Sequence, residues 1–360
     1  MEKEGGTLLI AGATGVAAQS LIDIAVHTPG WNVVGLCRTP PVNPPTGVCY
    51  IAADMLDAAG CREALGGVEV THLVYSARAK HKLYTAMAPG AKVGIENVDP
   101  NADMLRNVVA ACERPSLRHV HVVQGSKWYG FHLGPYPTPA LESAPGHMPP
   151  NFYFDQHRFL MDASSNKDWT WSTSRAAAIN GRDVGSGPNL MSTLGAYAAI
   201  CRHLGLPLDF PGKPGAYTSL MELTDAEHLA EAIFWMCSAP EARNQAFNVV
   251  NGDYFRWAQV WPRLAAHFGM EMGTVRYFPL VQWMADKGPV WNEIVQQNKL
   301  QPRALDEVAS WGFADFLLGL DFDVMSSTTK IRQAGFHPIV DTQDMMLDQL
   351  GHYRDQRILP

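Results

Sequence analysis

A tyrosine and a lysine near the middle of the chain have the chemistry of a proton-donating pair, although their spacing is unusual. Tyr153 opens a helix-like stretch, and four residues later, where a lysine on the same helix face would lower the pKa of the phenol, stands His157. The cation can instead come from Lys127, which follows a strand-like run at residues 118–124. Because parallel strands end at one edge of a sheet, we expect Tyr153 and Lys127 to converge there from separate elements.

The other reactive groups nearby have simpler interpretations. Ser126 could hydrogen-bond a carbonyl oxygen, but a loop serine beside the cofactor is the interpretation that we favour. His157 could donate a proton, whereas a solvated histidine on a helix surface is the interpretation that we favour. A Ser-His-Asp hydrolase is excluded because the chain has no Gly-x-Ser-x-Gly turn. Four aromatic residues either line a binding site or form ordinary core: Trp128, Phe131, Tyr136 and Phe152.

The beginning of the chain has the spacing of a dinucleotide-binding turn. An apolar run at residues 7–11 leads into Gly12 and Gly15, with Ala18 in the third position, and a helix-like stretch follows. Glycine at the first two positions permits a tight turn and a close backbone approach to a pyrophosphate at the helix N-terminus. We therefore expect a bound dinucleotide rather than a glycine-rich turn without a ligand.

The end of the second strand indicates which dinucleotide binds. An acidic residue there would bind the ribose 2′-hydroxyl of NAD, but the chain has Arg38 and Thr39, which can bind a 2′-phosphate. The alternative is that Arg38 is a solvated surface residue. Asp54 is placed to meet the adenine, and Ser76 and Ala77 would lie under the cofactor. The pattern favours NADPH.

These residues are positioned by alternating strands and helices. The first half predicts strands at residues 7–11, 31–37, 48–53, 71–75, 118–124 and 169–174, with helices at 19–27 and 99–112. The alternation predicts βαβ units and hence an α/β, Rossmann-type, doubly wound parallel sheet. The second half predicts helices at 190–204, 225–237 and 257–268 and a strand at 246–250.

The domain organisation follows from this pattern. Residues 1–180 are expected to form the dinucleotide-binding core, with a loop or lid at residues 134–150, where six prolines stand. Residues 181–360 are expected to complete the sheet and to form a smaller, mostly helical substrate cap over its carboxyl edge.

The composition excludes several classes of protein. A net charge of -7 argues against nucleic acid as the main partner. The six cysteines show no pairing or zinc-ligand spacing, so no metal site is expected. No signal-like start and no apolar run of roughly 20 residues is present. We expect a soluble, cytoplasmic protein without a membrane partner.

The chain resembles the progesterone 5β-reductase/iridoid synthase-like (PRISE) family of atypical extended short-chain dehydrogenases/reductases, and within it the microbial members. The resemblance runs nearly end to end. It is carried, in order, by GATGVAAQSL, GLCRTP, QGSKWYG, NFYFDQ, TWSTSR, YAAICRHLGLPLDFPG, NQAFNVVNGDYFRW and PVWNEIVQQNKL.

The resemblance implies NADPH-dependent 1,4-reduction of enones by a homodimer. The family's catalytic lysine and tyrosine correspond to Lys127 and Tyr153. Gln124, Gly125 and Tyr153 are expected to contact the cofactor together with Gly12. The family's nucleotide contacts correspond to Thr14, Gly15, Val16, Arg38, Thr39, Asp54, Met55, Ser76, Ala77, Val123 and Ile179.

Three positions depart from the family pattern. His157 and Arg158 replace an acidic pair, Ala176 replaces a proline and is expected to loosen a turn, and residues 186–188 are Ser-Gly-Pro. The substrate is therefore left open among steroid enones, monoterpene enals and small cyclic enones. Two alternative functions are a carbonyl reductase or alcohol dehydrogenase that works by 1,2-reduction at the same site, and a non-catalytic NADP sensor.

Overall fold

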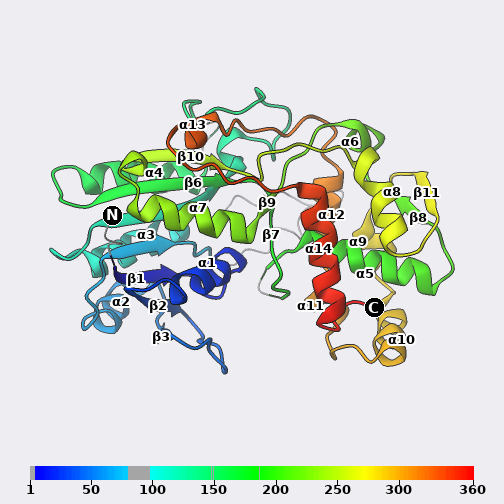
Figure 1. Ribbon diagram of the computed structural model, residues 1–360, viewed down its shortest axis with the longest axis horizontal. Helices are drawn as coiled ribbons and strands as arrows, with labels where there is room; N and C mark the ends of the chain where they lie inside the picture. The colour runs from blue at the N-terminus through cyan, green and yellow to red at the C-terminus, as the bar shows by residue number, and fades with distance from the viewer. Residues whose placement is uncertain (1–4, 80–97, 147, 149, 186) are drawn as a thin grey trace.

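The structure is a computed structural model that describes residues 5–79, 98–146, 148, 150–185 and 187–360, and these form two lobes (Figure 1). One lobe contains seven parallel strands in the order β10-β6-β5-β4-β1-β2-β3. The strands are β1 (Gly6–Ala11), β2 (Trp31–Cys37), β3 (Val48–Ala52), β4 (His72–Tyr75), β5 (His119–Gly125), β6 (Thr170–Ala176) and β10 (Gln245–Val249). The strand order reverses between β1 and β4, and doubly wound sheets bind ligands at the carboxyl ends of such a pair.

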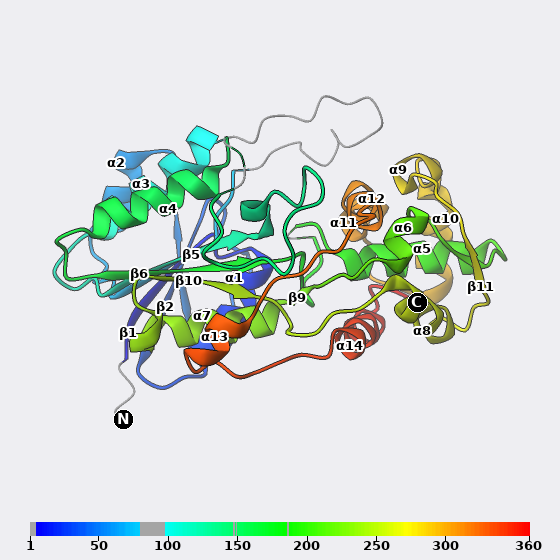
Figure 2. The same ribbon diagram turned by 90° about the horizontal axis from the view of Figure 1, so that it is seen from above.

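Helices cover both faces of this sheet, as Figure 2 shows. One face carries α1 (Val16–Val26) and α7 (Ala226–Ser238), and the other carries α2 (Ala58–Ala64), α3 (Val98–Cys112) and α4 (Phe152–Ser164). In β1, Leu8 and Ile10 pack with α1 and α7, whereas Leu9 and Ala11 pack on the opposite face. A parallel strand that is buried on both faces requires such a continuous apolar run.

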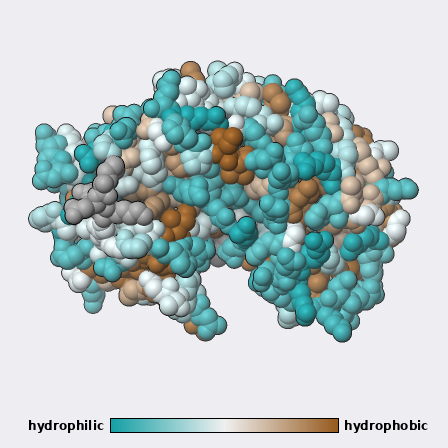
Figure 3. Space-filling view, viewed as in Figure 1, coloured by the Kyte–Doolittle hydropathy of each residue, from teal (hydrophilic) through white to brown (hydrophobic). Residues whose placement is uncertain are grey.

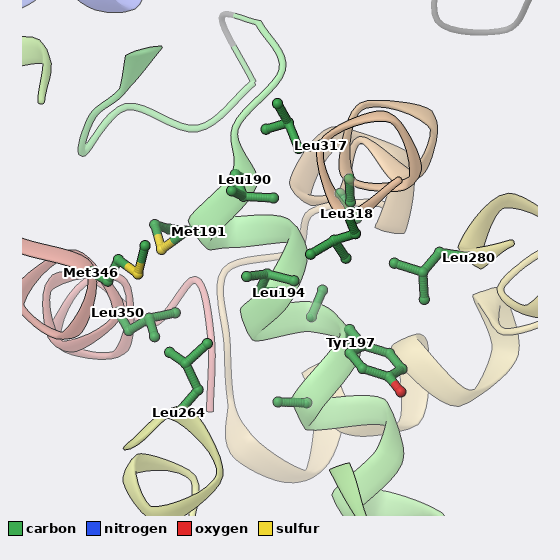
Figure 4. Close-up of a cluster of buried hydrophobic side chains, with 14 of the residues drawn as sticks. Leu190, Met191, Leu194, Tyr197, Leu264, Leu280, Leu317, Leu318, Met346 and Leu350 are labelled. Carbon is green, nitrogen blue, oxygen red and sulfur yellow. The ribbon is translucent and has the colours of Figure 1, made fainter. Parts of the chain in front are cut away.

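The second lobe is mainly helical and is centred on α5 (Leu190–His203). In Figure 4, Leu190, Leu194 and Tyr197 of α5 lie at the centre of a cluster of apolar side chains contributed by several helices. Two short strands, β8 (Leu208–Phe210) and β11 (Met272–Val275), pair beside it. The other helices of this lobe are α6 (Pro214–Thr218), α8 (Trp257–His267), α9 (Leu280–Trp283), α10 (Gly288–Asn298), α11 (Leu305–Val308), α12 (Trp311–Leu318) and α14 (Thr342–Asp355).

The two lobes are joined by elements from the second half of the chain. β7 (Ile179–Asn180) pairs with β9 (Thr224–Asp225), and α13 (Thr329–Gln333) returns from the helical lobe to pack near β10. The predicted α/β, doubly wound Rossmann fold is confirmed. The predicted strands and helices agree with the observed ones closely, except that the helix predicted at residues 19–27 begins at Val16, directly after Gly15.

Histidine and serine side chains form a buried ladder between β5 and β6. The His119 ring is hydrogen-bonded to Thr170 and Ser172 at 2.9 and 2.8 Å, and the His121 ring to Ser172 and Ser174 at 2.8 and 3.1 Å. Burial lowers the pKa of His121 to about 3 and that of His119 well below its usual value. Both imidazoles are therefore neutral at neutral pH.

Among the described residues, no helix combines the length and hydrophobicity needed to cross a membrane. The same part of the chain contains no group of three or more His, Cys, Asp or Glu side chains arranged to hold a metal ion.

Candidate active site

The turn between β1 and α1 approaches the end of β4 so closely that only glycine fits at its first position. Gly12 has φ +87°, and a Cβ there would lie 2.7 Å from both the backbone nitrogen and the Cα of Ala77. Gly15 is the N-cap of α1, and no side chain caps this helix. The N–H groups of its first turn are thus left for a ligand, and the helix dipole favours an anionic one.

The predicted nucleotide contacts follow the carboxyl edge of the sheet. Arg38 and Thr39 are exposed after β2, and Asp54 is exposed after β3 with its carboxylate accepting the Leu56 N–H at 3.0 Å. Ser76 donates its hydroxyl to the Ala11 carbonyl at 3.1 Å. Figure 3 shows a notch at the lower edge of the molecule, between the two lobes.

The remaining predicted contacts differ in exposure. Thr14 is exposed, and Met55 is buried. Val16 packs against the backbone of Gly181, where an added Cβ would overlap the Val16 side chain. Val123 and Ile179 are partly buried against the cluster beneath α1 and α7.

Gln124, near the end of β5, is hydrogen-bonded to the first turn of α4. Its side chain is 2% exposed, and its amide donates to the backbone carbonyl of Tyr153 at 3.0 Å. This placement follows from strand alternation, because Gln124 faces α4 whereas Val123 faces α1 and α7.

Tyr153 lies in the first turn of α4, and its hydroxyl reaches the ends of β5 and β6. A Cβ at Gly125 would lie 3.2 Å from that hydroxyl and 3.3 Å from the carbonyl oxygen of Ala176. The absence of a side chain at Gly125 therefore leaves space for the phenol at the carboxyl edge. The structure thus brings Gly125 and the Tyr153 hydroxyl together at this edge. The convergence of the Tyr153 and Lys127 side chains there stays a prediction.

Lys127 lies in a 3-10 turn at Ser126–Tyr129, directly after β5, and Asn151 connects this turn to α4. Asn151 is the N-cap of α4: its Oδ1 accepts the Tyr153 N–H at 3.0 Å, and its Nδ2 donates to the Lys127 carbonyl at 3.1 Å. One side chain thus holds the backbones of Lys127 and Tyr153 together.

Arg175, near the end of β6, fixes the residues that follow Lys127. Its guanidinium carbon lies 3.7 Å from the Trp128 ring centroid, and its Nη1 donates to the Tyr129 hydroxyl and to the Glu142 carbonyl, both at 3.1 Å. Tyr129 in turn donates to Asn248 of β10 at 2.5 Å. A buried guanidinium that stacks on an indole and donates to oxygen acceptors holds its neighbours firmly.

The proline-rich segment is a loop that is attached to both lobes. Ala140 forms a bridge with Ser326, and the Tyr136 hydroxyl accepts the Met325 N–H at 3.2 Å.

Glu222, which is 1% exposed, accepts both the N–H and the hydroxyl of Ser326. Burial raises the pKa of Glu222 to about 7, and the two hydrogen bonds from Ser326 oppose that rise.

The interpretation of His157 as a helix-surface residue is wrong. Its ring packs between the rings of Trp128 and Trp171, at centroid distances of 5.2 and 5.0 Å. Burial, helped by the positive charge of Arg175, lowers the pKa of His157 to about 4. The imidazole is neutral at neutral pH and is a packing residue rather than a proton donor.

The expectation that Ala176 loosens a turn is also wrong. Ala176 is the last residue of β6, pairs with Gly125 and Val249, and is 5% exposed. The next N–H, from Ala177, donates to the Thr224 hydroxyl at 3.0 Å, so the chain is held as it leaves the strand. Ser186, another departure from the family pattern, lies outside the described residues.

The four aromatic residues with two possible roles mostly belong to packed clusters. Trp128, Phe131 and Phe152 are each less than 9% exposed, and Tyr136 stacks on Tyr129 with centroids 6.3 Å apart. Phe131 also borders a cavity of about 740 Å³ between residues 131–135 and the helical lobe. Its lining includes neither Lys127 nor Tyr153.

Two residues that connect the site were not singled out from the sequence. Asn151 carried a recognisable signal, because an asparagine just before a helix-like stretch is a typical N-cap. Arg175 carried none, because its contacts with Trp128 and Glu142 depend on the strand order and on the fold of the proline-rich loop.

Comparison with solved structures agrees with this architecture. A UDP-glucose 4-epimerase of Thermus thermophilus complexed with NAD superposes with a TM-score of 0.65 at 17% identity, covering 97% of this chain and 99% of the epimerase. A putative epimerase of Burkholderia cenocepacia gives 0.67 at 16% identity, covering 98% and 99%. These likenesses show a fold of the doubly wound Rossmann class.

Sequence comparison narrows this class to one family. The model of the PRISE-like Rossmann-fold domain matches residues 68–360. The 3-oxo-Delta(4,5)-steroid 5-beta-reductase of Arabidopsis thaliana is 35% identical over 98% of this chain and 92% of its own length. The (S)-8-oxocitronellyl enol synthase of Catharanthus roseus is 32% identical over the same shares of the two chains. The chain belongs to the PRISE-like family, and the predicted resemblance is confirmed.

Proposed function

We propose that this protein is an NADPH-dependent reductase that adds hydride to the β-carbon of α,β-unsaturated carbonyl compounds. The observation that carries the proposal is the Tyr153 hydroxyl at the ends of β5 and β6, on a helix that Asn151 connects to the Lys127 turn. The names of the relatives agree with it, since one describes a reductase of 3-oxo-Delta(4,5)-steroids and the other a synthase of an enol.

A dinucleotide suits the carboxyl edge of this sheet. A Cβ at Gly12 would occupy the space between the turn and Ala77, and the uncapped first turn of α1 offers N–H donors to a pyrophosphate. Arg38 is exposed, and among the described residues its side chain has no hydrogen bond or ion pair, so its guanidinium is available to a 2′-phosphate. Bound NADPH would supply the hydride.

The residues of the chain would act on the carbonyl group. Tyr153 donates a hydrogen bond to the carbonyl oxygen and stabilises the negative charge that develops there as the enolate forms. The positive charge of Lys127 strengthens the phenol as a donor. A proton from water then reaches the α-carbon and completes the saturated product.

A second candidate is 1,2-reduction of a carbonyl group at the same residues, because the same acid over the oxygen would serve it. The two candidates are separated by incubating the protein with NADPH and a 2-cyclohexenone, a steroid 4-en-3-one or a monoterpene enal and then identifying the products. A saturated carbonyl compound supports the proposal, and an allylic alcohol supports 1,2-reduction. No NADPH consumption with any substrate would favour a non-catalytic NADP-binding protein.

The preference for NADPH is tested with Arg38→Ala. A hydrogen bond to a charged group contributes about 1.5–3 kcal/mol, so the Kd for NADPH should rise about 10- to 100-fold. The Kd for NADH should stay unchanged, because NADH has no 2′-phosphate. Equal changes for both cofactors would contradict this role of Arg38.

A further inference from the structure

We infer that Asn151 is a positioning residue that sets the distance between Lys127 and Tyr153, an inference whose catalytic consequence rests on the proposed function. Its side chain is 4% exposed and makes two hydrogen bonds, one to each backbone segment. The acceptor Oδ1 fixes the first turn of α4, and the donor Nδ2 fixes the turn that carries Lys127.

Capping alone does not call for an amide at this position. Other helices of the described chain are capped by carboxylates that only accept hydrogen bonds, such as Asp225 before α7 and Asp341 before α14. A carboxylate at a helix N-terminus is also favoured by the helix dipole. The amide of Asn151 adds a donor, and that donor reaches Lys127.

The Lys127 turn would keep its shape without this bond. The Lys127 carbonyl also accepts the Gly130 N–H at 3.1 Å, and Gly130 ends the turn in a left-handed conformation. On the other side, Gln124 still holds the Tyr153 carbonyl. Loss of the Asn151 donor should therefore let the two segments shift relative to each other without unfolding either of them.

Two variants separate the hydrogen bond donated by Asn151 Nδ2 from the capping of α4 by Asn151 Oδ1. Asn151→Ser keeps a hydroxyl that can cap α4 but cannot reach the Lys127 carbonyl, and Asn151→Asp keeps the cap and places a carboxylate oxygen against that carbonyl. Asp341→Ser is the matched control, because it makes a similar change at the cap of α14, away from the site.

Misplacement of a catalytic group by about 1 Å can reduce a rate about 100-fold. For both Asn151 variants we expect kcat for enone reduction to fall about 10- to 100-fold while the Kd for NADPH stays within about twofold. The deuterium isotope effect on kcat should rise, because only the chemical step is slowed. Asp341→Ser, which weakens an exposed helix cap, should lower the melting temperature and leave kcat unchanged.

Hydrogen exchange provides a readout that does not depend on activity. In both Asn151 variants the amides of residues 126–130 should exchange faster than in the native protein, whereas Asp341→Ser should leave them unchanged. If the native protein reduces no enone, the proposed function fails, and faster exchange would still support the structural role of Asn151. Unchanged exchange at residues 126–130, or native kcat in Asn151→Ser, would overturn the inference.

Discussion

Replacing Gly12 by alanine should abolish tight NADPH binding while leaving a folded protein. The added Cβ would lie 2.7 Å from the backbone of Ala77, whereas ordinary contact begins at 3.4 Å, so the turn must move by about 0.7 Å. The φ of +87° adds roughly 1–2 kcal/mol of backbone strain for any residue with a side chain. A shift of that size misaligns the N–H donors of the turn and of the first turn of α1.

The loss of one hydrogen bond to a phosphate, worth about 1.5–3 kcal/mol, should raise the Kd for NADPH about 10- to 100-fold. The Kd is measured by fluorescence titration, with thermal unfolding in the presence and absence of NADPH. Gly269→Ala is the matched control, since Gly269 has φ +62° but nothing within 4 Å of the added Cβ. The Gly269→Ala variant should lose stability through backbone strain alone and should bind NADPH with the native Kd. A Kd for Gly12→Ala within twofold of the native value would refute the placement of the pyrophosphate at this turn.

Three further predictions concern the acid, its surroundings and the buried histidines. Tyr153→Phe should reduce turnover by about 10²–10³-fold while NADPH binding survives, and unchanged turnover would contradict its role. Gly125→Ala should reduce kcat, because the added Cβ would lie 3.2 Å from the Tyr153 hydroxyl and would displace that hydroxyl. Steady-state kinetics should show the lower kcat, and a binding titration should show the native Kd for NADPH. The pKa of His121 is lowered by burial, so the unfolded chain binds a proton below about pH 6.5 that the folded chain does not, and stability falls as the pH falls. His121→Gln should therefore weaken the acid dependence of the free energy of unfolding, by about 0.7 kcal/mol per pH unit at about pH 6.5 and by about 1.4 kcal/mol per pH unit at about pH 5, and an unchanged slope in urea titrations would contradict this.

The sequence predicted the sheet well because its strands leave a direct signature. A parallel strand that is buried on both faces has no polar face, so residues 7–11 and 31–37 appear as continuous apolar runs between turn signals. α5 was equally predictable because its sequence is largely apolar, and twelve of its residues are buried.

The short elements of the second half could not be predicted. β7 and β9 have two residues each, and α9 and α11 have four. Segments of this length are not stable by themselves and take their conformation from the surfaces on which they pack. Local periodicity therefore contains little information about them.

The candidate site was predictable at the level of residues but not of contacts. Lys127 and Tyr153 could be named because both lie next to recognisable elements. The environment of His157 was missed because its two flanking rings come from other elements: Trp128 from the turn after β5 and Trp171 from β6. The position of His157 along its helix does not show which side of the helix these two rings cover.

The fate of the transferred hydride tests the proposed reaction most directly. The protein is incubated with NADPH deuterated at C4 of the nicotinamide and with 2-cyclohexenone, and the product is examined by NMR spectroscopy and mass spectrometry. We predict deuterium at the β-carbon of the saturated ketone, formed at least about 100-fold more slowly by Tyr153→Phe. Deuterium on the carbinol carbon of an allylic alcohol, or a Tyr153→Phe variant that forms the ketone at the native rate, would contradict it.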